Sequence, residues 1–251
     1  MAQWIYGRNA VEGLLHSEQR VLELYAADTM KNDAIVKEAL KKKIPVFYVP
    51  KTQLHRMSGT EKHQGLLAKA EDYRTYTLQE IIDGAKKKYP LIVILDGLED
   101  PHNLGAILRS ADAVNADGVI YAKNRSVSLN PTVAKVAVGA INTVKVAEVT
   151  NLVNAIEKLK DHGYWIVAAA NKDSRDYRTI DYKCPIALVI GNEGKGISRL
   201  VLENSDFRAG LPMKGKVNSL NASVAAGIFL YGIESNRFPP TGEAKYEKEN
   251  Q

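Results

Sequence analysis

The stretch "LIVILDGLEDPHNLGAILRSADA", residues 91–113, decides the fold class. It opens with a continuous apolar run that ends in Asp96, a pattern typical of a strand covered on both faces. Asp100-Pro101 then forces an extended entry and a turn, and a helical repeat of apolar residues begins at Asn103. A buried strand that leads through a polar loop into an amphipathic helix is the unit of a parallel α/β sheet.

The same alternation continues toward the C-terminus. The predicted strands are "LIVILD", "GVIYA", "VKVAEV", "YWIVAAA", "IALVIG" and "FRAGLPM", and helices are predicted at 131–138, 151–162 and 221–234. This order predicts an α/β domain over residues 90–236, with a mostly parallel sheet and helices on both faces. The charged, Pro-led tail over residues 237–251 is predicted to be disordered.

Residues 1–72 form a second, smaller series. Strands are predicted at "VLELYAA", "IPVFYV" and "HQGLLAKAE", and helices at "NAVEGLLHS", "KNDAIVKEALKKK" and "KTQLHRM". The longest of these helices places Ile35, Ala39 and Leu40 on one apolar face. These elements predict a small α/β domain, joined to the larger one by a linker at 73–89 that buries little and contains a helical turn or two.

Composition excludes several classes of protein. The 251 residues include no apolar run near the roughly 20 residues needed to span a bilayer, and the N-terminus lacks a signal-peptide pattern. A single cysteine, Cys184, allows no internal disulfide, so we expect a cytoplasmic protein with no membrane partner. The five histidines show no ligand spacing, and no metal is expected. The net charge of +5 permits a polyanionic partner.

Three loops after predicted strands hold most of the unpaired polar residues, and ligands of open α/β sheets bind at that edge. The second loop, "GNEGKGIS", is neither a Walker A motif nor G-x-G-x-x-G. Its glycines allow a close approach to a ligand, although a tight turn explains them nearly as well. Glu193 within it is either a surface charge or the partner of a cation across the site.

The other two loops hold further candidates. Asn103 is placed to cap a helix. Arg109 lies near the edge of its helix's apolar stripe, so it either extends to solvent or reaches over the strand ends toward a phosphate. In the third loop, "KVNSLNAS" (216–223) has more amides and hydroxyls than one helix cap needs.

In this order, the motifs "DGLEDPHNLGAILRSADA", "LVIGNEGKGIS" and "LPMKGKVNSLNASVAAG" resemble the SpoU family of the SPOUT superfamily over residues 90–235. Members of this family are RNA 2'-O-ribose methyltransferases that use S-adenosyl-L-methionine. "YGRNAVEGLL" and "HQGLLA" resemble the family's usual partner, an L30e-like RNA-binding domain. The two-domain arrangement is most similar to the 23S rRNA guanosine-2'-O-methyltransferases.

This resemblance implies a C-terminal trefoil knot, which sequence patterns alone do not predict, and a homodimer whose active site is completed at the subunit interface. It also implies two sets of site residues. The catalytic set is Arg109, at the centre, with Asn103, Glu193, Ser219 and Asn221. The cofactor-binding set is Gly191, Leu211 and Leu220, through backbone groups, with Ile190, Met213 and Ser219 lining the same cavity. Arg109 either accepts the hydroxyl proton with help from a substrate phosphate or stays cationic and stabilises the alkoxide.

Four residues are candidates for RNA contacts. Lys123 and Arg125 lie in "KNRSVSLNP", a loop that either contacts phosphate or is solvated and ends in a cap at Asn130. Arg8 and His63 belong to the motifs of the smaller domain.

The leading hypothesis is methyl transfer to a ribose 2'-OH of 23S rRNA, at a guanosine. The alternatives are the same reaction on tRNA, a non-catalytic RNA-binding assembly factor, and drug resistance through methylation of a different rRNA nucleotide. Three departures from the family pattern leave the proposed catalytic residues intact: Ser110 after Arg109, Val138 before Gly139, and "VNADGV" (114–119) where the family often has Phe-Gly.

Overall fold

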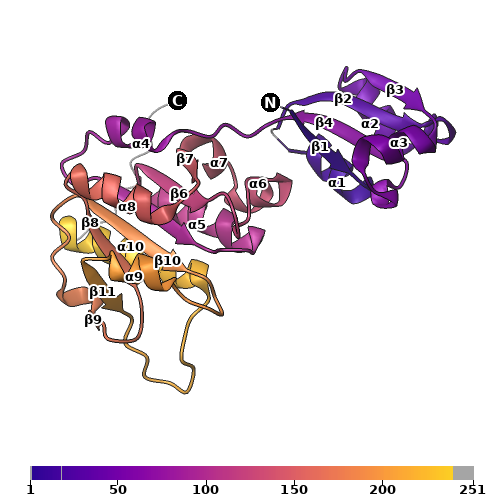
Figure 1. Cartoon of the computed structure of the whole chain (residues 1–251). Coiled ribbons are helices and arrows are strands. Elements are labelled where there is room, and N and C mark those ends of the chain that lie inside the picture. Colours follow the sequence, from indigo (N-terminus) through magenta and orange to yellow (C-terminus); the bar gives the residue numbers. More distant parts are fainter. Residues whose placement is uncertain (1, 18, 240–251) are drawn as a thin grey trace. The chain divides into compact units, whose positions relative to one another are not determined.

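The computed structural model describes residues 2–17 and 19–239 and divides the chain into two compact units (Figure 1). Residues 1–74 with 129–135 form the first, and residues 75–128 with 136–251 form the second. The short helix α6 (Pro131–Ala137) spans the boundary between the two groups.

The first unit is built on a four-stranded mixed sheet in the order β1-β4-β2-β3. Its elements are β1 (Ala2–Tyr6), α1 (Arg8–Leu15), β2 (Val21–Ala27), α2 (Ala34–Lys41), β3 (Val46–Val49), α3 (Lys51–Ser58) and β4 (Leu66–Glu71). β4 pairs antiparallel with β1 and β2, whereas β3 pairs parallel with β2. All the strands and helices predicted in this segment are present. β1 is an addition, because its strand character comes from pairing with β4.

Helices cover this sheet unequally. α1 and α2 pack on one face, where their apolar residues meet Ile5, Leu24 and Ala68. α3 packs on the opposite face through Leu54. The prediction that Leu40 lies on the buried face of its helix is wrong, because its side chain is 51% exposed.

The second unit is built on a seven-stranded sheet in the order β7-β6-β5-β10-β8-β11-β9, and its strand pairs are parallel. The strands are β5 (Leu91–Asp96), β6 (Gly118–Ala122), β7 (Val146–Val149), β8 (Trp165–Ala169), β9 (Arg175–Asp176), β10 (Ile186–Gly191) and β11 (Phe207–Gly210). The helices are α4 (Leu78–Gly84), α5 (Pro101–Ala113), α7 (Ala140–Thr143), α8 (Leu152–Asp161), α9 (Arg199–Glu203) and α10 (Ala222–Arg237). The α/β fold with a mostly parallel sheet is confirmed.

Helices lie on both faces of this sheet. Residues of α4, α8 and α9 share one core cluster with alternate strand residues such as Ile92 and Ile94. α5 and α10 pack against each other and against β6 and β10 outside that cluster, so they cover the other face. β10 is central in the sheet and buried along its length, which places its last residue, Gly191, beside the end of β5.

Two expectations about the ends of this unit need correction. The segment 73–89 contains α4, begun by a capping box between Thr77 and Glu80, and Ile81 and Ile82 of α4 are buried in the core. The expectation that this segment buries little is therefore wrong. Arg237, assigned to the polar tail, is the last residue of α10 and is buried. The prediction of disorder over 240–251 lies outside the described residues.

No helix in the described part of the chain is long and apolar enough to cross a membrane.

Candidate active site

The first two polar loops meet at the carboxyl edge of the parallel sheet. β5 and β10 are paired so that Asp96 lies opposite Gly191. The Asn192 side-chain amide donates to the Gly97 carbonyl at 2.8 Å, and the Asp96 carboxylate accepts the Ser198 backbone N–H at 2.6 Å. These bonds fix the loop after β10 against the loop after β5.

The loop after β10 is also closed on itself. The backbones of Asn192 and Gly196 exchange hydrogen bonds of 3.0 and 2.9 Å. The Asn192 Oδ1 accepts the Gly194 N–H at 2.9 Å. A Cβ built on Gly191 would lie 2.4 Å from the Gly196 carbonyl carbon and 2.5 Å from the Ile197 nitrogen. The close approach expected for this loop thus involves its own backbone, and Gly191 is required for it.

Asn103 and Glu193 are brought together across 90 residues of sequence. Asn103 is only 6% exposed, and its side-chain amide donates to Glu193 Oε1. Asn103 does not cap α5. That role belongs to Asp100, whose Oδ1 accepts the His102 N–H at 2.9 Å, with Pro101 as the first helical residue. The amide of Asn103 is therefore free to orient Glu193, which is exposed.

Arg109 lies six residues beyond Asn103 on α5, and its side chain is exposed. Among residues 2–17 and 19–239, no hydrogen bond or ion pair is found for its guanidinium. An arginine has five N–H donors in a planar fork that matches carboxylate and phosphate groups. All of these donors remain available to a ligand.

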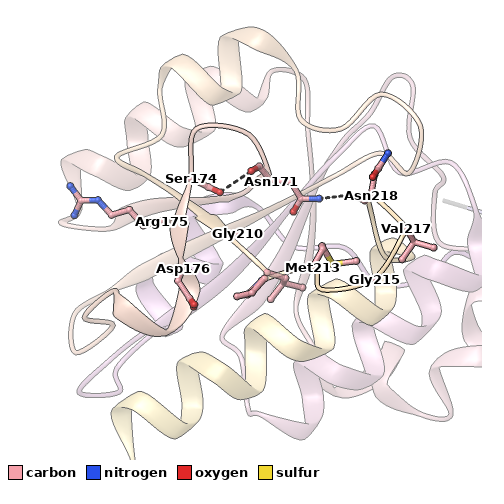
Figure 2. A pocket seen from close by; sticks show the side chains of 11 residues that line it. Asn171, Ser174, Arg175, Asp176, Gly210, Met213, Gly215, Val217 and Asn218 are labelled. Carbon is pink, nitrogen blue, oxygen red and sulfur yellow. Dashed lines mark hydrogen bonds between the residues drawn. The ribbon is translucent and has the colours of Figure 1, made fainter.

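A cavity of about 450 Å³ lies beyond the end of β11 (Figure 2). The Asn171 side-chain amide crosses it and donates to the Asn218 carbonyl at 2.8 Å. Figure 2 shows Arg175 pointing away from the other labelled side chains. The lining residues are Asn171, Ser174, Arg175, Asp176, Gly210, Leu211, Pro212, Met213, Gly215, Val217 and Asn218.

Two of the predicted cofactor residues, Leu211 and Met213, line this cavity. The other four lie outside its lining. Ile190 is buried in β10 and Gly191 ends that strand, whereas Ser219 and Leu220 directly precede the start of α10.

Asn221 is the N-cap of α10. Its Oδ1 accepts the N–H groups of Ser223 at 2.9 Å and Val224 at 3.3 Å, and the Ser223 hydroxyl at 2.6 Å. The side-chain NH₂ of Asn221 has no hydrogen-bond partner in the described part of the chain. One amide therefore caps the helix and still presents two donors, while Ser219 beside it is exposed.

The residues on α5 and the loop after β10 are not hydrogen-bonded to those before α10 within the described part of one chain. α5 packs beside α10, so that a Cβ on Gly227 would lie 3.8 Å from the Ser110 hydroxyl. No hydrogen bond between described residues joins Arg109, Asn103 or Glu193 to Ser219 or Asn221. A single chain thus holds one polar cluster at the ends of β5 and β10 and one cavity at the end of β11.

Sequence reasoning missed Asn171 and Asp176 in the cavity. A bidentate ion pair with Arg178, at 2.9 and 2.5 Å, lowers the pKa of Asp176 to about 2. The Asp176 carboxylate, which lines the cavity, is therefore ionised at neutral pH and paired with Arg178. The polar run "NKDSRD" after β8 was the available signal, since it follows a strand end like the other loops.

The residues expected to contact RNA differ in exposure. Arg8 is exposed and pairs with Asp33 at 2.6 Å. His63 is 6% exposed, and its Nδ1 accepts the Gly65 N–H at 3.0 Å. The His63 ring therefore supports its loop, and little of its surface is available to RNA.

Lys123 and Arg125 both lie on the loop after β6. Lys123 is exposed and lies 3.9 Å from Glu148. Arg125 is exposed and has a positive φ of 61°. Both side chains are accessible to a phosphate. No cluster of three or more His, Cys, Asp or Glu that could hold a metal ion occurs among the residues the structure describes.

The fold and site define a class: a parallel α/β protein with polar loops and a ligand-sized cavity at the carboxyl edge of its sheet, coupled to a separate small α/β unit. Residues 90–231 match the SpoU rRNA Methylase family, and residues 4–76 match the family described as RNA 2'-O ribose methyltransferase substrate binding. The chain belongs to the SpoU family and is an RNA 2'-O-ribose methyltransferase.

Named relatives agree with this assignment. The "Putative TrmH family tRNA/rRNA methyltransferase YacO" of Bacillus subtilis (strain 168) is 44% identical over 241 residues, which are 94% of this chain and 96% of that protein.

Solved structures agree as well. An AdoMet-bound rRNA methyltransferase from Sinorhizobium meliloti is 25% identical, with a TM-score of 0.62 over 92% of this chain and 86% of that one. The TrmH/SpoU tRNA modifying enzyme of A. aeolicus is 34% identical, with a TM-score of 0.55 over 64% of this chain and 80% of its own.

Proposed function

We propose that the protein transfers the methyl group of S-adenosyl-L-methionine to the ribose 2'-OH of a guanosine in 23S rRNA. The observation that carries this proposal is the exposed Arg109 on α5, the helix that also supplies Asn103 to the Asn103–Glu193 pair, with no partner for its guanidinium among the described residues. The Asn103–Glu193 pair lies at the sheet edge that also holds the cavity. A guanidinium with free donors and a carboxylate held by an amide are groups that can bind and orient a phosphate-flanked ribose.

The cavity fits the chemistry of the cofactor. Its volume of about 450 Å³ lies within the roughly 300–1,000 Å³ of small-molecule sites. Leu211 and Met213 would pack against the adenosine, while Asn171 and Asp176 supply hydrogen-bonding groups. Backbone groups at Gly191, Leu211 and Leu220 are proposed to complete the binding. When bound, the cofactor supplies an electrophilic methyl group on its sulfonium.

The protein's own residues then have to align and activate the hydroxyl. In-line displacement depends on alignment, which can supply much of the acceleration. A ribose hydroxyl is a weak nucleophile and must lose its proton as it attacks. We assign Arg109 one of two roles: it accepts this proton with help from a substrate phosphate, or it stays cationic and donates hydrogen bonds to the forming alkoxide while the phosphate takes the proton. Asn103 orients Glu193, and Ser219 and the free NH₂ of Asn221 are placed to contact the substrate.

A homodimer is part of the proposal, because the polar cluster and the cavity edge at Ser219 and Asn221 have no hydrogen bond between them in one chain. α10 supports this. Val224, Ile228 and Tyr231 are exposed at helical spacing and form an apolar stripe, which a symmetric partner would cover. The C-terminal knot and the L30e-like character of the first unit are proposed with it, on the strength of the family.

We prefer ribosomal RNA over tRNA as the substrate because a solved rRNA methyltransferase aligns with more of this chain than a solved tRNA enzyme does. The rRNA methyltransferase from Sinorhizobium meliloti matches 92% of this chain, whereas the tRNA modifying enzyme matches 64%. The match of residues 4–76 to a substrate-binding family is consistent with a large folded RNA.

The test is transfer of labelled methyl groups from S-adenosylmethionine to 23S rRNA fragments and to tRNA, followed by mapping of the modified ribose. We expect label at one guanosine of 23S rRNA. Label in tRNA alone would replace rRNA with tRNA as the substrate. If no RNA is labelled and calorimetry detects no binding of S-adenosylmethionine, an RNA-binding assembly role replaces the proposal.

A further inference from the structure

The sheet of the first unit has one face that is only half covered. α1 and α2 pack on one side, through contacts to Ile5 and Leu24. On the other side α3 packs against Ala27, Val49 and Leu67, with Tyr25 at the edge of this cluster. No helix of the first unit's described residues covers the rest of that face.

Three aromatic residues occupy this uncovered half: Trp4 of β1, Tyr25 of β2 and Phe47 of β3, which we call the aromatic row. The Trp4 and Tyr25 ring centroids lie 5.6 Å apart, and those of Tyr25 and Phe47 lie 5.1 Å apart with planes 26° from parallel. Trp4 is 39% exposed and Phe47 is 46% exposed. Clustered large apolar side chains that remain exposed mark interaction sites more often than chance surface residues do.

Polar groups hold the aromatic row in place and put an ammonium group at one end of it. The Lys69 ammonium lies 5.8 Å from the Trp4 ring centroid and 3.1 Å from Glu23 Oε1. Glu23 Oε2 accepts the Tyr25 hydroxyl at 2.7 Å. The Glu23 carboxylate is thus paired within the row, and the Lys69 ammonium sits at its Trp4 end.

We propose that the aromatic row is a stacking surface for unpaired bases of the RNA substrate. The inference rests on the proposed function, because it takes RNA as the substrate. Open sheets with exposed aromatic residues bind single-stranded RNA by stacking bases on the rings, and nearby cations contact the backbone. Residues 1–74 carry twelve Lys and Arg against nine Asp and Glu, which suits a polyanion better than an acidic or neutral protein partner.

The aromatic row is a different surface from the one predicted around Arg8. Arg8 begins α1 and pairs with Asp33 at the start of α2, and both helices lie on the opposite face of the sheet. Unpaired bases need open ring faces, whereas a duplex presents its phosphates and 2'-hydroxyls. We therefore expect the aromatic row to bind single-stranded RNA and the surface around Arg8 to bind duplex RNA, and an experiment can separate the two.

The chain's two tryptophans, Trp4 and Trp165, allow a direct measurement in the full-length protein. Trp165→Phe leaves Trp4 as the only tryptophan, and Trp4→Phe leaves Trp165 as a matched control in the second unit. We expect a 12-nucleotide single-stranded RNA of mixed sequence to quench Trp4 emission with a saturable isotherm. The same RNA annealed to its complement should quench Trp4 far less, and Trp165 should respond to neither. No quenching of Trp4 at RNA concentrations that saturate binding would overturn the proposal.

Substitutions then separate stacking from simple apolar contact. Trp4→Leu and Phe47→Leu keep apolar bulk but remove the ring, and each should weaken single-stranded RNA binding about fivefold to 100-fold. Trp4→Phe should retain most of the affinity. Equal affinity for the Leu and Phe variants would overturn the proposal, and so would a loss caused only by Arg8→Ala. Thermal unfolding of each variant excludes misfolding as the cause.

Methyl transfer distinguishes failure of this inference from failure of the proposed function. We expect Trp4→Leu to raise KM for rRNA with little change in kcat, because the row only binds. Wild-type transfer with an unchanged KM in Trp4→Leu would overturn the stacking surface and leave the proposed function standing. Absence of transfer by the wild type, together with absence of RNA binding, would remove both.

Discussion

Two helices of the second unit, α5 and α10, hold an arginine in opposite ways. On α5, Arg109 is exposed and has no partner among the described residues. At the end of α10, Arg237 is 6% exposed and donates to four backbone carbonyls. The acceptors are Tyr182 and Tyr89 at 2.9 Å, Pro90 at 3.1 Å and Cys184 at 2.8 Å.

This difference shows how to separate structural from functional arginines. A guanidinium whose donors are used within the chain ties segments together, here the residues before β5 and β10 to the end of α10. One whose donors are free can only be satisfied by water or a ligand. Burial lowers the pKa of Arg237 from its ordinary value, and the four carbonyls offset the cost of desolvating its charge.

The largest effect on stability is expected from Arg237→Met. It would leave the Tyr89 and Cys184 carbonyls without a donor, whereas Pro90 and Tyr182 keep the N–H groups of Ile186 and Cys184. We expect a loss of about 2–5 kcal/mol in the free energy of unfolding. Chemical denaturation measures this. Arg199→Ala is the control, because its exposed pair with Glu203 is worth about 0–1 kcal/mol. A loss for Arg237→Met no larger than the control's would contradict the structural role.

Arg109→Ala tests the other half of the comparison. We expect methyl transfer to fall by about 10²–10³-fold, the usual cost of losing one donor to a developing oxyanion. Because Arg109 has no partner, stability should change by less than about 0.5 kcal/mol, and S-adenosylmethionine binding should persist. If this variant unfolds as easily as Arg237→Met and retains methyl transfer, the functional role of Arg109 is contradicted.

Much of the fold was predictable because its strands are continuous apolar runs; β2, β5, β6 and β10 lie where those runs stand. Arg237 was not predictable. Its local sequence is polar and precedes two prolines, whereas its acceptors Tyr89 and Pro90 lie 148 and 147 residues away. Burial of a charge depends on such distant carbonyls, which no local pattern shows.

Within the site, loop positions were easier to predict than partners. The sequence placed Asn103 at a helix start, but Asp100 occupies the cap because Pro101 fixes the first helical residue. Asn171 and Asp176 were missed because β9 has only two residues and exists through pairing with β11. A two-residue strand that forms only through pairing leaves almost no recognisable pattern in the amino-acid sequence.

Gly191→Ala tests the close packing of the loop after β10, at the carboxyl end of the sheet. The new Cβ would lie 2.4 Å from backbone of the same loop, and overpacking of this kind costs about 1–3 kcal/mol. We expect a lower unfolding midpoint and weaker binding of S-adenosylmethionine in calorimetry. Gly194→Ala is the matched control, since the nearest atom to its Cβ would be Asn192 Oδ1 at 3.6 Å. Equal effects of the two variants would count against the close approach.

The last prediction concerns the start of α10, where the expected cost in stability is smaller than for Arg237→Met or Gly191→Ala. Asn221→Ala removes the N-cap and should cost about 1 kcal/mol, whereas Asn221→Ser keeps a capping oxygen. If Asn221 serves only as the helix cap, transfer should recover with stability in the Ser variant. We expect stability to recover and transfer to remain low, because Ser lacks the two free donors.

The eleven residues between β11 and α10, 211–221, have a practical consequence. Lys214 and Lys216 are exposed in this irregular segment, which makes it a preferred place for trypsin to cut. A chain nicked there should keep both pieces together in native gels, because Arg237 holds the far end of the released helix. Slower nicking in the presence of S-adenosylmethionine would then report, without any label, how tightly the segment closes over its ligand.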